Sequence, residues 1–152
     1  MKARIVIGAL TLSASALVGI AVHEGYRGEA YTPVKGDVPT IGYGTTDGVK
    51  PGDTIEPVQA LVRKLQDVQR FEGALRQCVR VPLHQYEYDA FLSLAYNIGP
   101  GAFCSSTLVR RLNASDYAGA CAEILRWDRF RGEPLRGLTL RRQAENRQCL
   151  GQ

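Results

Sequence analysis

The hydrophobic pattern begins with an uninterrupted uncharged stretch, residues Ile5–Val22, which we call the N-terminal run. A helix of eighteen residues is about 27 Å long, which is marginally enough to span the hydrocarbon core of a membrane. Because Lys2 and Arg4 precede the run, the positive-inside rule places the N-terminus in the cytoplasm and the remaining chain on the other side. Half of the run consists of small or weakly polar residues, so we expect weak insertion that permits later escape into water.

Two other interpretations of the N-terminal run stay open. Ala14-Ser15-Ala16 resembles the Ala-x-Ala site at which a signal peptide is cleaved. The run could also form an amphipathic or core helix, although the lack of any charged residue within it disfavours this interpretation. We predict a membrane segment at residues 1–22 and, because about 130 residues then remain, one small domain at residues 23–152.

After the run, the pattern changes from short strands to helices. Residues 31–46 are rich in Gly, Pro, Thr and Val, and we expect a small hairpin or sheet with a turn at Val34–Asp37 and a strand at Thr40–Gly44. Apolar residues then recur with a helical period. The expected helices are Val58–Cys78, Gln85–Ile98, Ser105–Leu112, one ending near Trp127, and Thr139–Leu150 after a loop at Arg131–Leu138. The expected fold is α+β, mostly α, with a small N-terminal β element and a helical lobe.

The net charge and the cysteine content indicate which partners, disulfides and cofactors to expect. The net charge of +4 and the pI of about 9.0 favour anionic partners, such as anionic lipid or bacterial wall polymers. The basic residues are scattered rather than gathered in a run, so we expect no nucleic-acid partner. Four cysteines in an exported chain are consistent with two disulfides, and three pairings are open. No Cys-x-x-Cys pair occurs and only two histidines are present, so neither a metal nor an organic cofactor is expected.

Glu24 is the first candidate for catalysis, because it closely follows the N-terminal run. Hydrolysis of a glycosidic bond needs a protonated carboxyl group for the leaving oxygen and a second carboxylate that activates water or stabilises the cation. Burial beside nonpolar surface would keep the Glu24 carboxyl protonated, as a general acid requires. Asp37 could then act as the base and the Thr40 hydroxyl could position water, if all three share one cleft. Each residue alone also fits a purely structural role at a helix end, a turn or a strand.

These residues stand in motifs that resemble the phage lysozyme (endolysin) family. The motifs are Glu24-Gly25 with Tyr31, Pro39–Gly44, Ala95–Gly99, Phe103 with Ser106–Leu108, Arg126-Trp127, and Gly137–Thr139 with Arg142. The resemblance implies a lysozyme-like fold and a muramidase, which hydrolyses the β-1,4 bond between N-acetylmuramic acid and N-acetylglucosamine in peptidoglycan. It implies that Glu24 is the acid, that Thr40 is the catalytic threonine, and that Arg142 pairs with Glu24. Tyr31 is expected to support the active site.

The chain departs from the family pattern at the second catalytic carboxylate. The family usually has it nine residues after the glutamate, where this chain has Pro33. Asp37 is the only aspartate between Glu24 and Thr40, so it is our candidate. A lytic transglycosylase needs one acid and no such aspartate, and that activity stays open. A non-catalytic, membrane-tethered wall-binding module and a membrane-permeabilising protein also stay open.

The N-terminal run resembles the signal-arrest-release segment of one endolysin subgroup. This resemblance implies export by the host secretion machinery and an inactive form tethered in the bacterial inner membrane, with the N-terminus inside. It further implies release of an active enzyme, expected to be a monomer, into the periplasm. We expect the tether to hold Glu24 at the lipid surface, away from Asp37 and Thr40. The run contains no cysteine, so control of release by thiol–disulfide exchange is not expected.

The disulfide pairing is a separate expectation. We predict Cys78–Cys104 and Cys121–Cys149, because each pair would link neighbouring helices of the helical lobe. Sequence alone does not fix the connectivity, so this choice awaits the structure.

Overall fold

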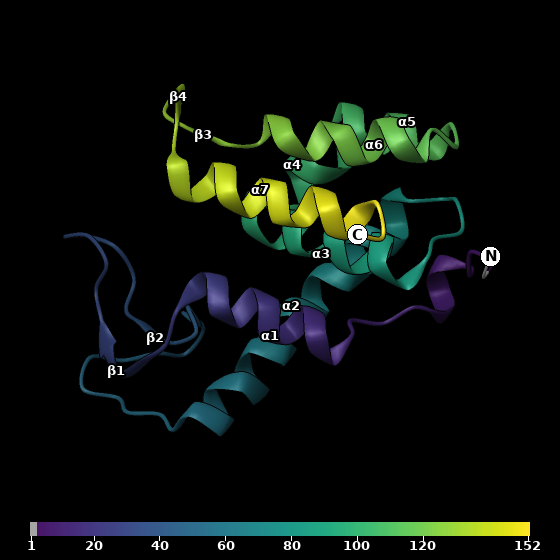
Figure 1. Ribbon diagram of the computed structural model, residues 1–152. Coiled ribbons are helices and arrows are strands. Elements are labelled where there is room, and N and C mark those ends of the chain that lie inside the picture. The colour runs from purple at the N-terminus through teal and green to yellow at the C-terminus, as the bar shows by residue number, and fades with distance from the viewer. Residues whose placement is uncertain (1–2) are drawn as a thin grey trace. The chain divides into compact units, whose positions relative to one another are not determined.

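The computed structural model describes residues 3–152, which divide into two compact units (Figure 1). The β unit consists of residues Ala14–Arg70, and the helical unit consists of residues 3–13 together with Phe71–Gln152. Helix α2, Pro57–Cys78, begins in the β unit and ends in the helical unit. The expected α+β, mostly helical fold is confirmed, with two small antiparallel hairpins among the helices of residues 3–152.

The β unit is built around a short hairpin. It contains α1 (Ala14–Glu24), β1 (Arg27–Tyr31), β2 (Thr40–Gly42) and the first part of α2. The loop between the strands contains the expected turn, in which the Asp37 amide donates to the Val34 carbonyl at 2.9 Å. A small apolar core supports the hairpin, formed by Ile41, Val49, Ile55 and Ala60 with Ala30 and Tyr43 packed against it.

The helical unit has α3, Gln85–Ile98, at its centre. Every residue from Glu87 to Ala95 is buried, and α7 packs against this helix. A capping box starts α3, in which the His84 amide donates to the Glu87 carboxylate at 2.8 Å. The other elements are α4 (Pro100–Cys104), α5 (Thr107–Asn113), α6 (Tyr117–Glu123), the 3-10 helix η2 (Ile124–Arg126), β3 (Arg129–Phe130), β4 (Glu133–Pro134) and α7 (Arg136–Cys149).

Element boundaries differ from the expected ones in the second half of the chain. Pro100 opens a separate helix, α4, because proline fits the first turn of a helix but cannot extend α3. The expected loop at Arg131–Leu138 instead contains the turn of the β3–β4 hairpin, where Gly132 has a φ of +86°. Helix α7 therefore begins at Arg136, three residues before the predicted start.

The N-terminal run is not one continuous helix in this folded form. It contains the 3-10 helix η1 (Ile7–Ala9), an irregular stretch at residues 10–13 and then most of α1. Among residues 3–152, no helix is both long enough and apolar enough to cross a membrane. The eighteen-residue helix that the pattern suggested is thus absent here, and the predicted division at residues 22 and 23 stays a prediction for a tethered form.

Buried carboxylates of the helical unit explain the break in the run. Glu72 accepts a hydrogen bond from the Leu12 amide at 2.7 Å. Asp89 accepts from the amide of Ser13 at 3.1 Å and from its hydroxyl at 2.6 Å. Both carboxylates are buried, and a buried carboxylate requires hydrogen-bond donors. These bonds take the Leu12 and Ser13 amides, so the backbone stays irregular until Ala14.

Arg4, just before the run, is held by a third buried carboxylate. Its guanidinium donates to both oxygens of Glu87, at 2.7 and 3.0 Å, and lies 3.5 Å from the centroid of the Tyr117 ring. The hydrogen bond to Glu87 raises the pKa of Arg4 above its ordinary value. The next residue, Ile5, pairs with Leu83 through two backbone hydrogen bonds of 2.7 and 2.9 Å. Residues 4–13 are therefore an integral part of the helical unit.

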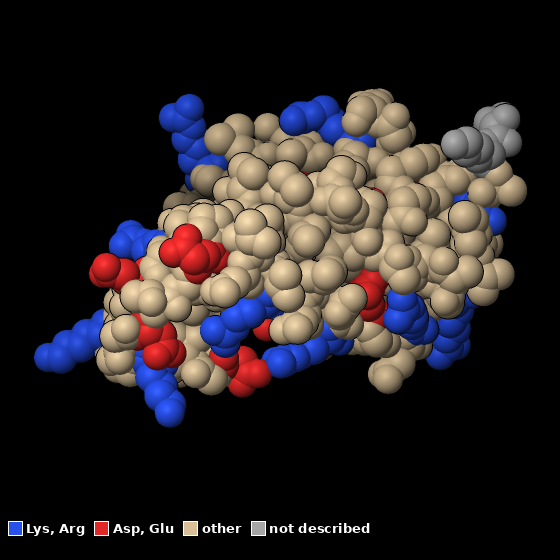
Figure 2. Space-filling model, turned by 90° about the horizontal axis from the view of Figure 1, so that it is seen from below, with Lys and Arg blue, Asp and Glu red and all other residues tan. Residues whose placement is uncertain are grey.

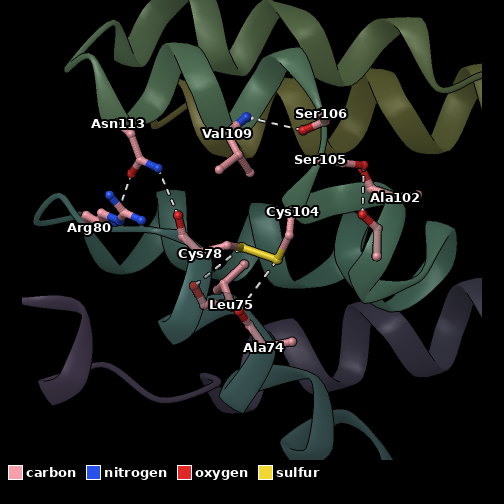
Figure 3. Close-up of a disulfide and its surroundings, with 11 residues drawn as sticks. Ala74, Leu75, Cys78, Arg80, Ala102, Cys104, Ser105, Ser106, Val109 and Asn113 are labelled. Carbon is pink, nitrogen blue, oxygen red and sulfur yellow. Dashed lines mark hydrogen bonds between the residues drawn. A yellow bond between two sulfur atoms is a disulfide. The ribbon is translucent and has the colours of Figure 1, made fainter.

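Both predicted disulfides are present. Cys78–Cys104 joins the end of α2 to the end of α4, and Cys121–Cys149 joins α6 to the end of α7. Figure 3 shows the first bridge near Asn113, whose side chain accepts from the Arg80 amide and donates to the Cys78 carbonyl, each at 2.8 Å. The bridges span sequence separations of 26 and 28 residues, for which loop entropy predicts about 3–4 kcal/mol of stabilisation each.

Replacing Arg4 with Met tests whether residues 4–13 stabilise the helical unit. The variant leaves the buried Glu87 carboxylate without its cation, so we expect the free energy of unfolding to fall by about 1.5–3 kcal/mol. Urea unfolding of the soluble protein measures the change. Arg147→Met, at an exposed position of α7, is the control and should change stability by less than about 0.5 kcal/mol. Equal stability of the Arg4→Met and wild-type proteins would contradict the stabilising contact.

Candidate active site

Glu24 is the last residue of α1, where the chain leaves the helix and continues into β1. Gly25 ends the helix, because its φ of +72° is in the left-handed region and its amide donates to the Ala21 carbonyl at 3.0 Å. Glu24 is exposed, as is every residue from Val22 to Arg27. The expected burial of its carboxyl beside nonpolar surface is therefore wrong.

The hairpin brings Thr40 and Tyr31 opposite each other. They are paired in the antiparallel register, and Thr40 is buried, with its hydroxyl donating to the Val38 carbonyl at 3.3 Å. Residues 26–31 line an open depression, in which the Arg27 guanidinium lies 4.5 Å from the centroid of the Tyr31 ring. Asp37 lies in the exposed loop between the strands. Its assignment as the base stays a prediction.

Helix α2 fixes β2 and the turn that follows it. Gly42 has a φ of +64°, and a Cβ atom at this position would lie 2.9 Å from the Cβ atom of Ala60, so only glycine permits this close approach. In the turn, the Thr45 hydroxyl donates to the Asp67 carboxylate at 2.5 Å, and Arg63 donates to the Asp47 carbonyl at 2.6 Å. The position of Thr40, two residues before Gly42, thus depends on α2.

Lys64 is a residue near Glu24 that the sequence analysis missed. It is completely buried on α2, in line with Ala60 and Val68, which are buried as well. The Lys64 Nζ atom and the Glu24 Oε2 atom both lie against Gly44, at 3.6 and 3.3 Å from the position that a Cβ atom on Gly44 would take. The sequence did contain a signal for its burial: Lys64 is four residues from both Ala60 and Val68, so all three lie on one face of the helix.

Arg142, the arginine expected to pair with Glu24, lies on α7 in the helical unit and is completely buried. It donates to the Asn97 side-chain oxygen at 2.5 Å, and its Nη1 atom lies 2.8 Å from the Glu145 carboxylate. Burial lowers the pKa of the Arg142 guanidinium, and the Glu145 carboxylate opposes this effect. The pairing with Glu24 would join residues of different units and stays a prediction.

Charged side chains of both signs occur on the surface. Figure 2 shows lysine and arginine side chains interspersed with acidic ones on the face seen from below. Arg70 and Asp47, for example, form an exposed ion pair at 2.8 Å. Within residues 3–152, no group of three or more His, Cys, Asp or Glu side chains could hold a metal ion. The candidate groups in the β unit are therefore a carboxyl, a hydroxyl and nearby cations.

The β unit thus contains an exposed glutamate at a helix end and a buried threonine on a small antiparallel hairpin, in a chain that is otherwise mostly helical. The chain belongs to the phage lysozyme family, whose sequence profile matches residues 21–145. It is accordingly a glycoside hydrolase, and its substrate class is peptidoglycan. The matched range includes Glu24, Asp37, Thr40 and Arg142.

Individual relatives match nearly the whole chain. The endolysin of Acyrthosiphon pisum secondary endosymbiont phage 1 is 41% identical over 138 residues, which cover 88% of this chain and 94% of that protein. The SAR-endolysin of Pseudomonas phage phiKMV is 38% identical over 141 residues, which cover 90% and 87%. Among solved structures, the endolysin from Escherichia coli O157:H7 phage FAHEc1 matches with a TM-score of 0.84 at 38% identity, covering 94% of this chain and 95% of that one.

The contact between β2 and α2 can be tested with two glycines that differ in their surroundings. Gly42 and Gly48 both have positive φ, so alanine at either position should cost about 1–2 kcal/mol of stability. Only the Gly42→Ala side chain would meet α2, so it should cost about 1–3 kcal/mol more in urea unfolding. We also expect lower lytic activity for Gly42→Ala than for Gly48→Ala. Equal stability and equal activity of the two variants would refute the role given to this contact.

Proposed function

We propose that this chain is a phage endolysin that lyses the host cell by hydrolysing the β-1,4 bond between N-acetylmuramic acid and N-acetylglucosamine. The observation that carries the proposal is the family match over residues 21–145, a range that includes both Glu24 and Thr40. The names of the relatives agree with it, and they do not favour a transglycosylase or a wall-binding module. The net charge of +4 also favours association with anionic wall polymers.

In the proposed reaction, Glu24 donates its proton to the glycosidic oxygen as the bond to the anomeric carbon breaks. A water molecule, positioned by the Thr40 hydroxyl, adds to the anomeric carbon and passes its proton to Asp37. The exposure of Glu24 and Asp37 in the same unit is compatible with access of a glycan chain to both. Arg142 would hold Glu24, and Tyr31 with Arg27 would contact the glycan along β1.

We further propose that the host secretion machinery exports the chain with its N-terminus inside, and that the N-terminal run tethers it in the inner membrane until release into the periplasm. The run's weak hydrophobicity and the SAR-endolysin name of the phiKMV relative support this proposal. Ala16, Ile20 and Ala21 of α1 are buried in the folded protein. In the tethered form these residues would lie in lipid, so the β unit would lack α1 and Glu24 would be misplaced. The released enzyme would act as a monomer.

Two carboxylate variants test the catalytic assignment. Glu24→Gln and Asp37→Asn should each lower the lysis rate of outer-membrane-permeabilised Gram-negative cells by at least about a hundredfold while staying folded, since each removes a group that transfers a proton. Loss of turbidity and circular dichroism are the measurements. Glu56→Gln, which changes an exposed glutamate of the same unit, is the control and should keep wild-type activity.

The pattern of losses decides between mechanisms. If only Glu24→Gln is inactive, Asp37 is structural and a single-acid mechanism, as in a transglycosylase, takes precedence. If Glu24→Gln retains full activity, the proposed muramidase mechanism is wrong.

Strengthening the N-terminal run tests the tethered form. Nothing lies within 4 Å of a Cβ atom built on Gly8 or Gly19, so the first carbon of a side chain meets no neighbour at either position in the folded enzyme. Each leucine adds about 1.5–3 kcal/mol of favourable burial in lipid. We expect the Gly8→Leu/Gly19→Leu variant to stay in the membrane fraction without lysing cells, whereas Gly8→Ser/Gly19→Ser is released. Membrane fractionation of expressing cells measures this, and normal release of the leucine variant would contradict the tether.

A further inference from the structure

Lys64 is a charged residue on the buried face of helix α2. Its exposed fraction is 0%, and its neighbours at the same face, Ala60 and Val68, are apolar. An ammonium group removed from water requires nearby oxygen atoms or an opposite charge, because it is otherwise strongly destabilising. The long lysine side chain must therefore bring its Nζ atom to such groups.

The Nζ atom of Lys64 and the carboxylate of Glu24 come together at Gly44. The position of a Cβ atom on Gly44 would be 3.3 Å from Glu24 Oε2 and 3.6 Å from Lys64 Nζ. The two charged atoms are thus no more than about 7 Å apart, a separation at which opposite charges in a protein attract appreciably. Gly44 has a φ of +86° and no side chain that would separate them.

The backbone next to Gly44 is fixed by the same helix. Thr45 pairs with Ile41 through two backbone hydrogen bonds of 2.9 and 3.0 Å, and its hydroxyl donates to Asp67, one helical turn after Lys64. Helix α2 therefore holds the turn through Asp67 and presents the Lys64 ammonium beside it. The Glu24 carboxylate approaches that turn from the end of α1.

We infer that Lys64 is a positioning residue for Glu24, whose carboxyl group it holds against Gly44 at the end of α1. This inference rests on the proposed role of Glu24 as the acid. When Glu24 gives its proton to the leaving glycosidic oxygen, a carboxylate remains, and the buried ammonium stabilises that negative charge as it develops. Lys64 contacts neither the glycan nor water in this scheme, because it is closed to solvent.

Steady-state kinetics on a soluble glycan oligomer of alternating N-acetylglucosamine and N-acetylmuramic acid tests the inference. We expect Lys64→Met to lower kcat by at least about tenfold with KM changed by less than about twofold, because charge stabilisation acts in the transition state. Lys64→Arg retains the charge and should recover at least about a third of wild-type kcat. Lys50→Met, at an exposed position, is the control. Wild-type kcat in Lys64→Met, or equal losses in the Met and Arg variants, would overturn the inference.

A double variant separates positioning from general support of the fold. In the Glu24→Gln background, Lys64→Met should cause no further loss of the residual rate, because the group that it positions is gone. A further tenfold loss would show that Lys64 acts independently of Glu24. If wild-type protein cleaves the oligomer and Glu24→Gln does not, a normal rate in Lys64→Met removes the inference and leaves the proposed function intact.

Gly44→Ala provides a second test of the inference if the Lys64→Met variant does not fold. Its methyl group would lie 3.3 Å from Glu24 Oε2, so the carboxylate would have to shift by a few tenths of an ångström, and kcat should fall while KM stays near the wild-type value. Gly48→Ala has a similar positive φ of +69° but meets nothing within 4 Å, and it controls for backbone strain. Equal kcat values for the two alanine variants would also overturn the inference.

Discussion

The burial of the Lys64 ammonium is the constraint on which the β unit depends. This residue of α2 is completely closed off from water. Burial of a charge is tolerated only when negative or polar groups lie close to it. The Lys64 Nζ atom lies near Gly44, and the Glu24 carboxylate reaches the same glycine from the end of α1. Glycine suits position 44 because its φ of +86° is in the left-handed region, and a side chain there would also contact both charged groups. In the proposed mechanism, the Glu24 carboxyl is thus placed by a neighbouring charge rather than by an apolar pocket.

The proposed tethering puts the N-terminal run under a second constraint, because one sequence must then suit both lipid and water. Its small residues keep the hydrophobic gain in a bilayer low, and in the folded protein its buried backbone groups need partners. Glu72 and Asp89 provide those partners for Leu12 and Ser13, while Glu87 binds Arg4. The buried carboxylates of the helical unit therefore stabilise the irregular backbone of residues 4–13 in the folded protein.

Local patterns in the sequence predicted much of the fold. The period of 3.6 located α2 and α3, and the pairing chosen for cysteines on neighbouring helices is present, although the sequence left three pairings open. The irregular stretch in the N-terminal run could not be predicted, because the carboxylates that cause it lie 60 and 76 residues further along the chain. Val58 and Val62 kept the helical period yet are exposed, since the buried face of α2 contains Lys64 instead.

For the candidate site, the motifs identified Glu24 and Thr40, whereas Lys64 escaped notice because a lysine in a helical pattern is normally assigned to solvent. The expected burial of Glu24 was wrong because Gly25 ends α1 at the surface.

The central claim is that the chain cleaves its glycan by adding water to a bond whose leaving oxygen receives a proton from Glu24. Mass spectrometry of peptidoglycan digested in water enriched in oxygen-18 tests it most directly. The claim predicts fragments that end in reducing N-acetylmuramic acid and carry the heavy oxygen at that end, formed by the wild-type protein and not by Glu24→Gln. Fragments that end in unlabelled anhydromuramic acid would contradict it.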